Sequence, residues 1–489
     1  MTNRTDETSE QKRFSLASVP EPAERPERIL LGERRMSDVE ALMWNVEKDP
    51  HLDPTFGSVT ILDRPPDLPR LRRRLLRMVD RIPRLHQRVE PSLGRLAPPE
   101  WQDDPEFDID YHMRHVALPA PGSRRQLFDL ATLLVRDPFD RTRPLWEFVV
   151  VDGLEEGRSA LVQKMHHTIT DGEGGIRMSE QFIDVERDAP DIDEVVLELE
   201  PEPPDANILE AAGDTIGHTW RRTLGVAQRA GTAAGDTLLH PSRLASAGPD
   251  LIETFRSAVR QLTVTDPAHS TLWTERSLRR RLEVLDVDFD DARAAAKTLG
   301  GSLNDFFVTG AAGGAGQYHE RLGSPVNTLR IAMPVSTRTD KSAGGNAFVP
   351  TRSVVRVGDD PVERFESIHA QLDQTKHERV LGLVDQLAGF LNLLPTSVLA
   401  RFTLEQARTV DFTTSNVRAA PFDLYIAGAF IEATYPLGPL GSTAFNVTMM
   451  SYRGALNMGL HIDTGAIAEP ELLRDCIAEA YAELIAAAS

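Results

Sequence analysis

An acidic break that contains several prolines divides the sequence into two long segments with similar patterns. Residues 188–207 read DAPDIDEVVLELEPEPPDAN, a composition that favours a linker over a packed helix or strand. On both sides of this break, strand-like runs alternate with helical patterns, which is typical of α/β domains. The 489 residues also exceed what one ordinary hydrophobic core holds. We therefore expect domains over residues 36–185 and 266–489, joined over residues 186–265 by a linker that is acidic and then helical.

The first segment carries strand patterns and one amphipathic helix. Residues 143–154 and 159–167 predict two strands, and the turn-forming letters DGLEEGR between them predict a hairpin. Another strand is expected over residues 56–62, followed by a helix that Pro83 ends. The apolar stripe of that helix consists of Leu71, Leu75, Val79 and Ile82.

Arginines cover the other faces of the same helix, at Arg72, Arg73, Arg74, Arg77 and Arg81. A charged face of this kind is usually solvated, and this is the interpretation that we favour. The alternative is that the face attracts the phosphates of CoA or anionic lipid headgroups.

The second segment repeats the α/β pattern. A helix is expected over residues 303–322, and a strand that runs into a loop is expected over 328–338. Residues 411–431 and 443–463 are rich in strand-forming residues. The chain closes with a helical pattern over residues 469–488.

Composition excludes several classes of protein. No stretch approaches the roughly 18 to 20 apolar residues that a membrane-spanning helix needs. Residues 1–35 are polar and lack an apolar segment of signal-peptide type, so we expect a disordered tail and a cytoplasmic location. The single cysteine, Cys476, allows no internal disulfide, and we interpret it as a packing residue of the last helix. The net charge of −20 argues against general binding of nucleic acid.

Two adjacent histidines stand at the end of a predicted strand, in VQKMHHTITDGEGG over residues 162–175. Side chains alternate along a strand, so His166 and His167 are expected to point to opposite sides. Asp171 is close enough to fold back on the turn, and Gly172 allows a tight backbone path. Because the pKa of an ordinary histidine is about 6.5, one of this pair can act as a general base.

Other interpretations of this pair compete with catalysis. A zinc site usually needs three or four ligands, and the local sequence lacks the spacing of known zinc motifs, so we expect no metal. A serine hydrolase would need a nucleophile turn of the GxSxG type, which is not found here at a transition from strand to helix. The remaining alternative is that the pair and its aspartate form only a polar strand end. The residues alone leave the catalytic and the structural interpretation open.

The segment HHTITDG resembles the HHxxxDG motif of the acyltransferase superfamily that includes chloramphenicol acetyltransferase and the condensation domains of peptide synthetases. From about Met36 to the C-terminus, the chain more narrowly resembles the bacterial wax ester synthase/diacylglycerol acyltransferase family. The matching letters are MSDVEALMW, PLW, SLNDFF, MPVSTR and SYRGALNMGLHID. One departure occurs at residues 415–421, which read SNVRAAP where the family often continues Ser-Asn-Val with Pro-Gly-Pro.

The resemblance implies two chloramphenicol-acetyltransferase-like domains, each with a mixed sheet and covering helices, and an active site at their interface. It implies transfer of a long-chain acyl group from acyl-CoA to a fatty alcohol or diacylglycerol, which yields wax esters or triacylglycerol. Acyl-CoA is then a substrate, and no separate cofactor is expected. His167 would be the general base and His166 a supporting residue, while Asp171 would anchor the turn.

The resemblance assigns further residues of the site. Asn304 would donate to the oxyanion, although an asparagine there also suits a helix start. Gly172, Asp305, Pro144 and Trp146 would be structural residues at the site.

Two rival functions fit the same motif. One is a condensation-type acyltransferase that uses a carrier-protein thioester, and the other is a non-catalytic lipid-binding relative. A narrow apolar stripe in the linker, made of Ala212, Ile216, Trp220 and Leu224, favours packing between domains. Its alternative is attachment to a membrane or to the surface of a lipid droplet.

Overall fold

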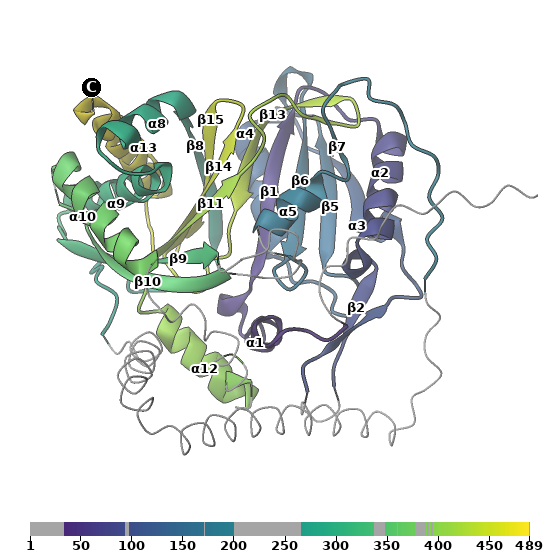
Figure 1. The fold of residues 1–489 in the computed structure, drawn as a ribbon, viewed down its shortest axis with the longest axis horizontal. Coiled ribbons are helices and arrows are strands. Elements are labelled where there is room, and N and C mark those ends of the chain that lie inside the picture. The colour runs from purple at the N-terminus through teal and green to yellow at the C-terminus, as the bar shows by residue number, and fades with distance from the viewer. Residues whose placement is uncertain are drawn as a thin grey trace, which may run out of the picture.

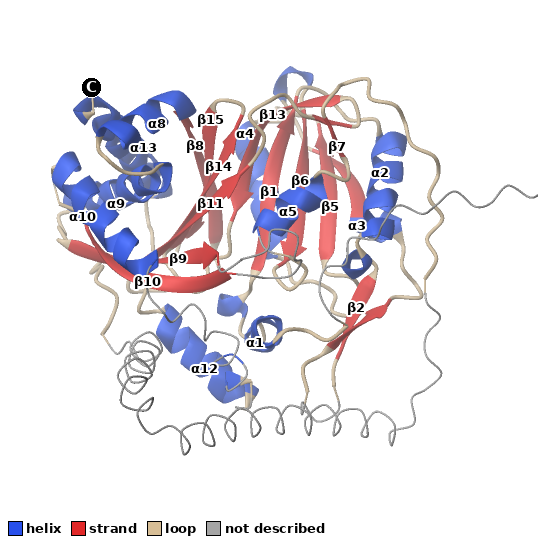
Figure 2. Ribbon diagram, viewed as in Figure 1, coloured by secondary structure: helices blue, strands red, loops and turns tan. Residues whose placement is uncertain are grey.

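The computed structural model describes residues 34–92, 97–170, 172–199, 266–336, 348–358, 360–376, 388, 391–392 and 395–488. Figure 1 shows two curved sheets that lie side by side, each with helices on its outer side. Figure 2 shows the same layers by type of element, and the fold is therefore mixed α/β, as the sequence predicts.

The first sheet is formed mainly by the N-terminal half. Its strands are β1 (Thr55–Leu62), β4 (Met113–Ala117), β5 (Trp146–Asp152), β6 (Ser159–His166), β7 (Ile183–Asp184), β12 (Tyr425–Ile426) and β13 (Ala429–Leu437). They are arranged in the order β4-β5-β6-β1-β13-β12-β7. The sheet is mixed, because β4 runs parallel to β5 while β5, β6 and β1 are antiparallel. The predicted hairpin is confirmed as β5 and β6.

The second sheet belongs entirely to the C-terminal half. Its strands are β8 (Arg280–Asp288), β9 (Thr328–Ser336), β10 (Phe348–Arg356), β11 (Phe412–Arg418), β14 (Phe445–Tyr452) and β15 (Ala455–Asp463). Their order is β10-β9-β11-β14-β15-β8, and β11 runs parallel to both of its neighbours. A separate two-stranded sheet pairs β2 (Gln87–Glu90) with β3 (Glu100–Asp103).

Helices cover both sheets (Figure 2). The N-terminal half contributes α1 (Asp38–Val46), α2 (Leu68–Arg81), α3 (Ile109–His112), α4 (Arg124–Arg136) and α5 (Gly172–Ser179). The C-terminal half contributes α8 (Phe289–Thr298), α9 (Leu303–Arg321), α10 (Pro361–Lys376), α12 (Thr396–Ala407) and α13 (Pro470–Ala487). Short 3-10 turns occur at Pro50–Leu52, Pro83–Leu85 and Glu155–Gly157. Cys476 is fully buried in α13, in agreement with a packing role.

The small residues of α9 explain how that helix fits into the second core. A Cβ atom at Gly314 would collide with the backbone of Ile477, so the glycine lets α9 and α13 approach closely. The neighbouring Phe306 and Phe307 are fully buried in the same core as Tyr481. The segment FFVTGAAGGAG therefore forms the part of α9 that is buried on nearly all sides.

A crossover from the C-terminal half completes the first sheet. Residues 425–437 leave the second sheet, and β13 pairs antiparallel with β1, with Val59 opposite Tyr435. At the return, a Cβ atom at Gly459 of β15 would collide with the carbonyl oxygen of Pro436 in β13. The two sheets are thus joined by strands, and the break at residues 186–265 does not by itself separate them.

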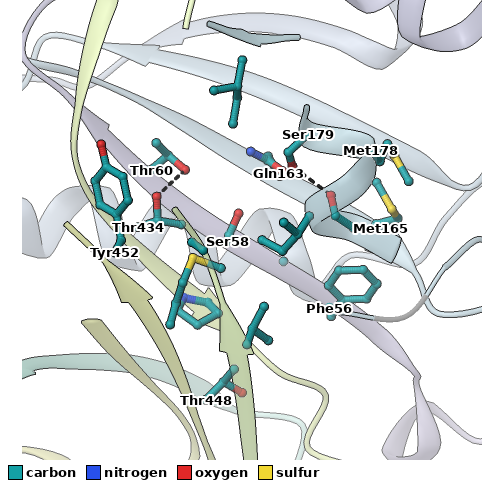
Figure 3. Close-up of a pocket in the computed structure, with 18 of the residues that line it drawn as sticks. Phe56, Ser58, Thr60, Gln163, Met165, Met178, Ser179, Thr434, Thr448 and Tyr452 are labelled. Atoms are coloured by element: carbon teal, nitrogen blue, oxygen red, sulfur yellow. Dashed lines mark hydrogen bonds between the residues drawn. The ribbon is translucent and has the colours of Figure 1, made fainter. Parts of the chain in front are cut away.

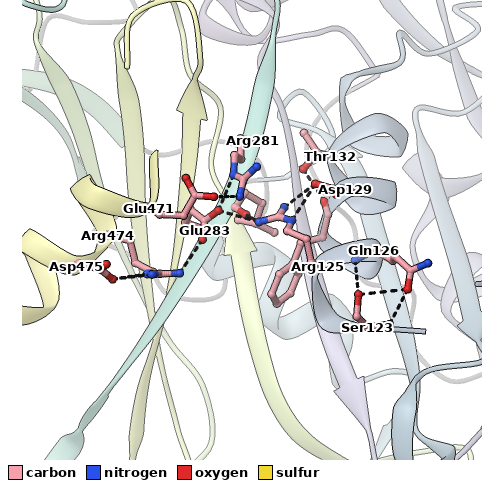
Figure 4. Close-up of polar contacts among 12 residues, drawn as sticks. Ser123, Arg125, Gln126, Asp129, Thr132, Arg281, Glu283, Glu471, Arg474 and Asp475 are labelled. Carbon is pink, nitrogen blue, oxygen red and sulfur yellow. Dashed lines mark hydrogen bonds and ion pairs between the residues drawn. The ribbon is translucent and has the colours of Figure 1, made fainter. Parts of the chain in front are cut away.

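A buried carboxylate also links the two halves, as Figure 4 shows. Glu283 of β8 accepts hydrogen bonds from Arg125 of α4 at 2.8 Å, from Arg281 at 2.6 Å and from Arg474 of α13 at 3.2 Å. The Glu283 side chain is 6% exposed, so these contacts are weakly screened by solvent. They hold α4, which packs against the first sheet, to the edge of the second sheet.

The arginines of α2 are solvated only in part, which corrects our expectation: the side chains of Arg72 and Arg73 are 42% and 30% exposed, whereas others are covered. Arg74 is 3% exposed and lies 2.7 Å from Asp184, and Arg70 also contacts that carboxylate. Arg70 donates to the carbonyl of Ala189 at 2.6 Å, and Arg73 forms an ion pair with Asp191. These contacts fasten the start of the predicted linker across α2. Arg70 and Arg74 are less exposed than the sequence pattern of the helix predicts, because a distant part of the chain covers them.

Several predictions fall outside the described residues. They concern the polar tail up to residue 33 and the part of the linker over residues 200–265, with its stripe from Ala212 to Leu224. Among the helices that the structure describes, none has the length and apolar character needed to cross a membrane.

Two buried histidines predict a loss of stability in acid. Burial lowers the pKa of both His112 and His461 to about 4, from 6.5. Between pH 6.5 and pH 4 these histidines are protonated in the unfolded chain but stay neutral in the folded chain. The free energy of unfolding therefore decreases as the pH falls from 6.5 toward 4. Each group contributes about 3 kcal/mol to this loss. The melting temperature, measured across this pH range, is expected to fall.

The variant His112→Phe provides the control for this prediction. Phenylalanine suits the aromatic stack between Phe107 and Trp146 and carries no titrating group. Its melting temperature should fall less steeply between pH 6.5 and 4, and an unchanged slope would contradict the assignment to His112.

Candidate active site

The histidine pair lies where β6 ends in a tight turn. The N–H of Ile169 donates to the carbonyl of His166 at 3.0 Å, which closes a turn that contains His167. The strand end is fixed on both sides, because His166 lies opposite Thr55 of β1 and its N–H donates to the carbonyl of Leu145 at 3.1 Å. The position of the turn is therefore fixed by hydrogen bonds to the neighbouring strands as well as by its own sequence.

His166 points away from the space between the sheets and is fully buried. Its Nδ1 accepts from the N–H of Thr168 at 3.1 Å and lies 2.6 Å from the hydroxyl of the same residue. The proton therefore resides on Nε2, which donates to Glu47 Oε2 at 2.7 Å. The rings of Trp44 and Phe139 meet the imidazole edge-on. The imidazole of His166 is thus held at both nitrogens, and its supporting role in catalysis stays a prediction.

Further charged groups surround the turn on the buried side. Burial raises the pKa of the Asp53 carboxyl, which precedes β1 and accepts from the N–H of Thr55 at 2.8 Å. Burial lowers the pKa of Lys164, whose ammonium lies 3.6 Å from Glu147 and 4.1 Å from the centre of the Phe139 ring. Lys164 and Glu147 thus pair on the far side of β6 from the cavity.

His167 points in the opposite direction and lines a cavity between the two sheets. Its ring is half-buried and lies 4.6 Å from the ring of Phe56, measured between centroids. The predicted divergence of the two histidines is confirmed: one enters a cavity and the other anchors the turn.

The cavity has a volume of about 500 Å³ and receives residues from both halves of the chain. Strands β1 and β6 and helix α5 line it from the N-terminal half, and β11, β13 and β14 line it from the C-terminal half (Figure 3). Its walls are largely apolar, with Phe56, Met165, Met178, Leu437 and Met450 among them. The SNVRAAP segment reaches it too, through Ser415, Val417, Arg418, Ala419 and Ala420.

One wall of the cavity carries a short row of polar side chains, which Figure 3 labels. Ser58 of β1 lies opposite Gln163 of β6 in the ladder. Two residues along β1, the hydroxyl of Thr60 lies 3.2 Å from that of Thr434 on β13. Among the described residues, no hydrogen bond engages the side chain of Gln163. A ligand in this cavity therefore meets apolar surface and a few groups that can form hydrogen bonds.

Asn304 and Asp305 lie at the start of α9. The helix is capped by a reciprocal pair, because Ser302 accepts from the N–H of Asp305 while Asp305 Oδ2 accepts from the N–H of Ser302 at 2.7 Å. Asp305 also lies 2.9 Å from Nδ1 of His369 and is 1% exposed, so it is a structural residue. Asn304 is not the cap. Its Oδ1 accepts from Asn416 of β11 at 3.5 Å, and Asn304 does not itself line the cavity.

Pro144 and Trp146 support β6 from the neighbouring strand. Trp146 is fully buried, donates from Nε1 to the carbonyl of Leu85 at 2.8 Å and stacks on His112. Pro144 is buried beside it. Leu145, between them, provides the carbonyl that binds the His166 N–H.

Two residues of the motif are described only in part or not at all. Asp171 lies outside the described residues, so its role as the anchor of the turn stays a prediction. Gly172 is the first residue of α5, which places the glycine where the turn becomes a helix. Among the residues that the structure describes, no cluster of three or more metal-ligating side chains occurs.

The sequence analysis missed the residues that hold the motif from behind, namely Glu40, Glu47 and Arg84. Glu40 does carry a signal, because Ser37 and Glu40 have the spacing of a capping box. Glu47 and Arg84 carry none, since each meets the motif only through tertiary structure.

The comparisons with known proteins agree with this arrangement. Residues 36–307 match the wax ester synthase/diacylglycerol acyltransferase catalytic domain, and residues 347–485 match the C-terminal domain of the same family. A Mycobacterium tuberculosis protein named as a candidate diacylglycerol O-acyltransferase is 34% identical over 465 residues, which cover 93% of each chain. Another M. tuberculosis protein with such a name is 30% identical over 441 residues, covering 87% of this chain and 93% of the relative.

Solved structures share the fold at lower identity. A wax ester synthase/diacylglycerol acyltransferase from Marinobacter aquaeolei superposes with a TM-score of 0.61 at 20% identity, covering 93% of this chain and 99% of that one. The first condensation domain of the calcium-dependent antibiotic synthetase superposes with a TM-score of 0.58 at 15% identity, covering 93% and 96%. With both of its domains matched in order, the chain belongs to the wax ester synthase/diacylglycerol acyltransferase family.

Proposed function

We propose that this acyltransferase moves a long-chain acyl group from acyl-CoA to the hydroxyl of a fatty alcohol or of diacylglycerol. The observation that carries the proposal is the position of His167. It is the histidine of the motif that opens on a largely apolar cavity built by both halves of the chain. A cavity of about 500 Å³ suits part of a lipid chain together with the reacting groups.

In this mechanism His167 acts as the general base. It takes the proton of the acceptor hydroxyl while the oxygen attacks the thioester carbonyl carbon. The tetrahedral intermediate collapses, the carbon–sulfur bond breaks, and the CoA thiolate receives the proton from His167. No covalent bond to the enzyme forms. Bringing both substrates together in one cavity supplies a large share of the rate enhancement.

The oxyanion of the intermediate needs hydrogen-bond donors. Asn304 is our candidate, as the resemblance implies, and its side chain contacts β11, a strand that lines the cavity through Ser415 and Val417. The amide Nδ2 of Asn304 is the donor that such a role requires, since its Oδ1 is the acceptor in that contact.

We propose that the protein meets its acceptor at a lipid surface. Val185 and Phe422 both line the cavity, yet they are 64% and 52% exposed. Two large apolar side chains at the rim of an apolar cavity would lower the free energy of contact with a membrane or a lipid inclusion.

The two rival functions make different demands. A condensation-type enzyme would take its acyl group from a carrier protein, whereas a non-catalytic relative would bind lipid without turnover. Purified protein should be incubated with a radiolabelled palmitoyl group, supplied either as palmitoyl-CoA or as the thioester of a carrier protein, and with either hexadecanol or dioleoylglycerol, and the products separated. We expect labelled ester with at least one acceptor. Ester formation only from a carrier-bound palmitoyl group would favour the condensation type, and binding without ester would favour the non-catalytic relative.

The polar row in the cavity predicts how the acceptor is discriminated. Along a strand with a rise of about 3.3 Å per residue, Ser58 and its partner Gln163 lie roughly 7 Å from Phe56, which borders His167. The ester groups of a diacylglycerol reach this distance from its free hydroxyl, whereas a fatty alcohol presents only hydrocarbon there. A free amide therefore favours an acceptor that carries ester carbonyls.

We expect Gln163→Leu to raise the KM for dioleoylglycerol by about tenfold, the value of one hydrogen bond. The KM for hexadecanol should change little, so hexadecanol serves as the internal control. Steady-state kinetics with both acceptors tests this expectation. Equal losses with both acceptors would show that Gln163 shapes the cavity without recognising the ester.

A further inference from the structure

Helix α1 lies behind the turn that carries the histidine pair, on the side away from the cavity. Its two glutamates, Glu40 and Glu47, are seven residues apart, which is about two helical turns, so both project from one face. Ser37 fixes the start of the helix through a reciprocal cap with Glu40. Neither glutamate lines the cavity, and each contacts the motif by a different route.

Glu47 reaches the first histidine directly. Its Oε2 accepts the Nε2–H of His166 at 2.7 Å, and the glutamate side chain is 15% exposed. Arg141 flanks the same carboxylate at 3.5 Å, donates to the carbonyl of Trp44 at 2.9 Å and stacks over its ring. The imidazole is therefore held at both nitrogens, by α1 on one side and by Thr168 on the other.

Glu40 reaches the turn through an arginine. Arg84 lies 2.6 Å from Glu40 Oε1 and donates from the same nitrogen to the carbonyl of Thr168 at 2.8 Å. Both side chains are nearly fully buried, at 2% and 3% exposure. A buried guanidinium that is paired with a carboxylate in this way fixes the carbonyl that it binds.

The helix is itself fastened to the C-terminal half. Val46 packs with Leu399 of α12 in one small core. Asn392 donates to the carbonyl of Asp38 at 2.8 Å and accepts from Asn45 at 3.2 Å. Because α1 contacts both halves, the turn is held in register with the wall of the cavity that the other half provides.

We propose that α1 is a positioning element for the general base, with Glu47 acting through His166 and Glu40 acting through Arg84. Glu47 and Glu40 are positioning residues, because neither reaches the cavity. This inference rests on the proposed function only in naming His167 as the base. Its physical basis is that a displacement of about 1 Å in a catalytic group lowers rates by up to about 100-fold.

The test compares two substitutions of one residue. Glu47→Ala removes the acceptor of the His166 Nε2–H, and we expect kcat to fall by about 10- to 100-fold with little change in the KM for palmitoyl-CoA. Glu47→Gln keeps a carbonyl oxygen at the same place, so it should restore most of kcat. Lys48→Gln is the matched control, because Lys48 is an exposed neighbour that does not line the cavity.

Each outcome separates the possibilities. Wild-type kcat in Glu47→Ala, or equal impairment of the alanine and glutamine variants, would overturn the positioning role. A wild-type protein that forms no ester would instead refute the proposed function. In that case crystal structures of the wild type and of Glu47→Ala decide the inference alone, since an unmoved His167 side chain in the variant would contradict it.

Discussion

His167→Ala is expected to lower kcat for ester formation by about 10²- to 10⁴-fold, the usual contribution of a general base. The imidazole lines the cavity and is only half-buried, so its removal leaves the turn and the sheet intact. The hydrogen bonds of that turn come from His166, Thr168 and Ile169, which are unchanged. The melting temperature and the affinity for palmitoyl-CoA should therefore stay close to those of the wild type.

His166→Ala provides the contrast within the motif. His166 is fully buried and bonded at both nitrogens, so its loss should lower the melting temperature as well as kcat. Turnover, affinity for palmitoyl-CoA and melting temperature should be measured for both variants. Near-normal turnover of His167→Ala with both acceptors would show that the base lies elsewhere and would leave HHTITDG as a structural turn.

Trp146→Ala should cause the largest loss of stability among the residues that we assign to the site. Trp146 is fully buried, and its ring stacks on His112 at 4.6 Å between centroids and meets Phe148 edge-on. Truncation of a buried tryptophan costs about 3 to 5 kcal/mol and should lower the melting temperature by roughly 5 °C in a chain of this length. It also leaves the buried carbonyl of Leu85 without the Nε1–H donor.

Activity should respond to this substitution only through stability. Trp146→Phe keeps most of the apolar volume and loses the hydrogen bond, so its melting temperature should lie between those of the wild type and of the alanine variant. Thermal unfolding and turnover below the transition of each variant test this expectation. A large loss of turnover in Trp146→Phe at a temperature where it is fully folded would instead assign the PLW segment a direct catalytic part.

Local patterns predicted much of the fold because they report which residues must be buried. The alternation and apolar runs around β1, β5 and β6 and the stripe of α2 each describe a face that packs against a core. The motif itself predicted that the side chains of His166 and His167 point to opposite sides, since alternation along a strand is a local property. Family membership followed from several such letters in a fixed order.

Contacts between distant residues could not be read in the same way. The arginines of α2 have the pattern of a solvated face, yet Asp184 covers Arg74 and the carbonyl of Ala189 binds Arg70. The strands over residues 425–437 look like the rest of the second segment, but they complete the sheet of the first. No local sequence pattern predicts such an ion pair or strand pairing, because both depend on how the two sheets and their helices pack together.

By itself, the sequence determined that the chain forms two α/β segments, that a histidine pair ends a strand, and that the two side chains of the pair point to opposite sides. Only the tertiary structure showed which residue contacts His166 and which segments line the cavity beside His167. Glu47 accepts a hydrogen bond from His166 although the two residues are 119 positions apart in the sequence. The wall of the cavity opposite His167 is formed by β11 and β14. The physical reason is that the spacing of apolar residues is a local property of the sequence. An active site, in contrast, consists of side chains from distant segments that only the folded chain brings together.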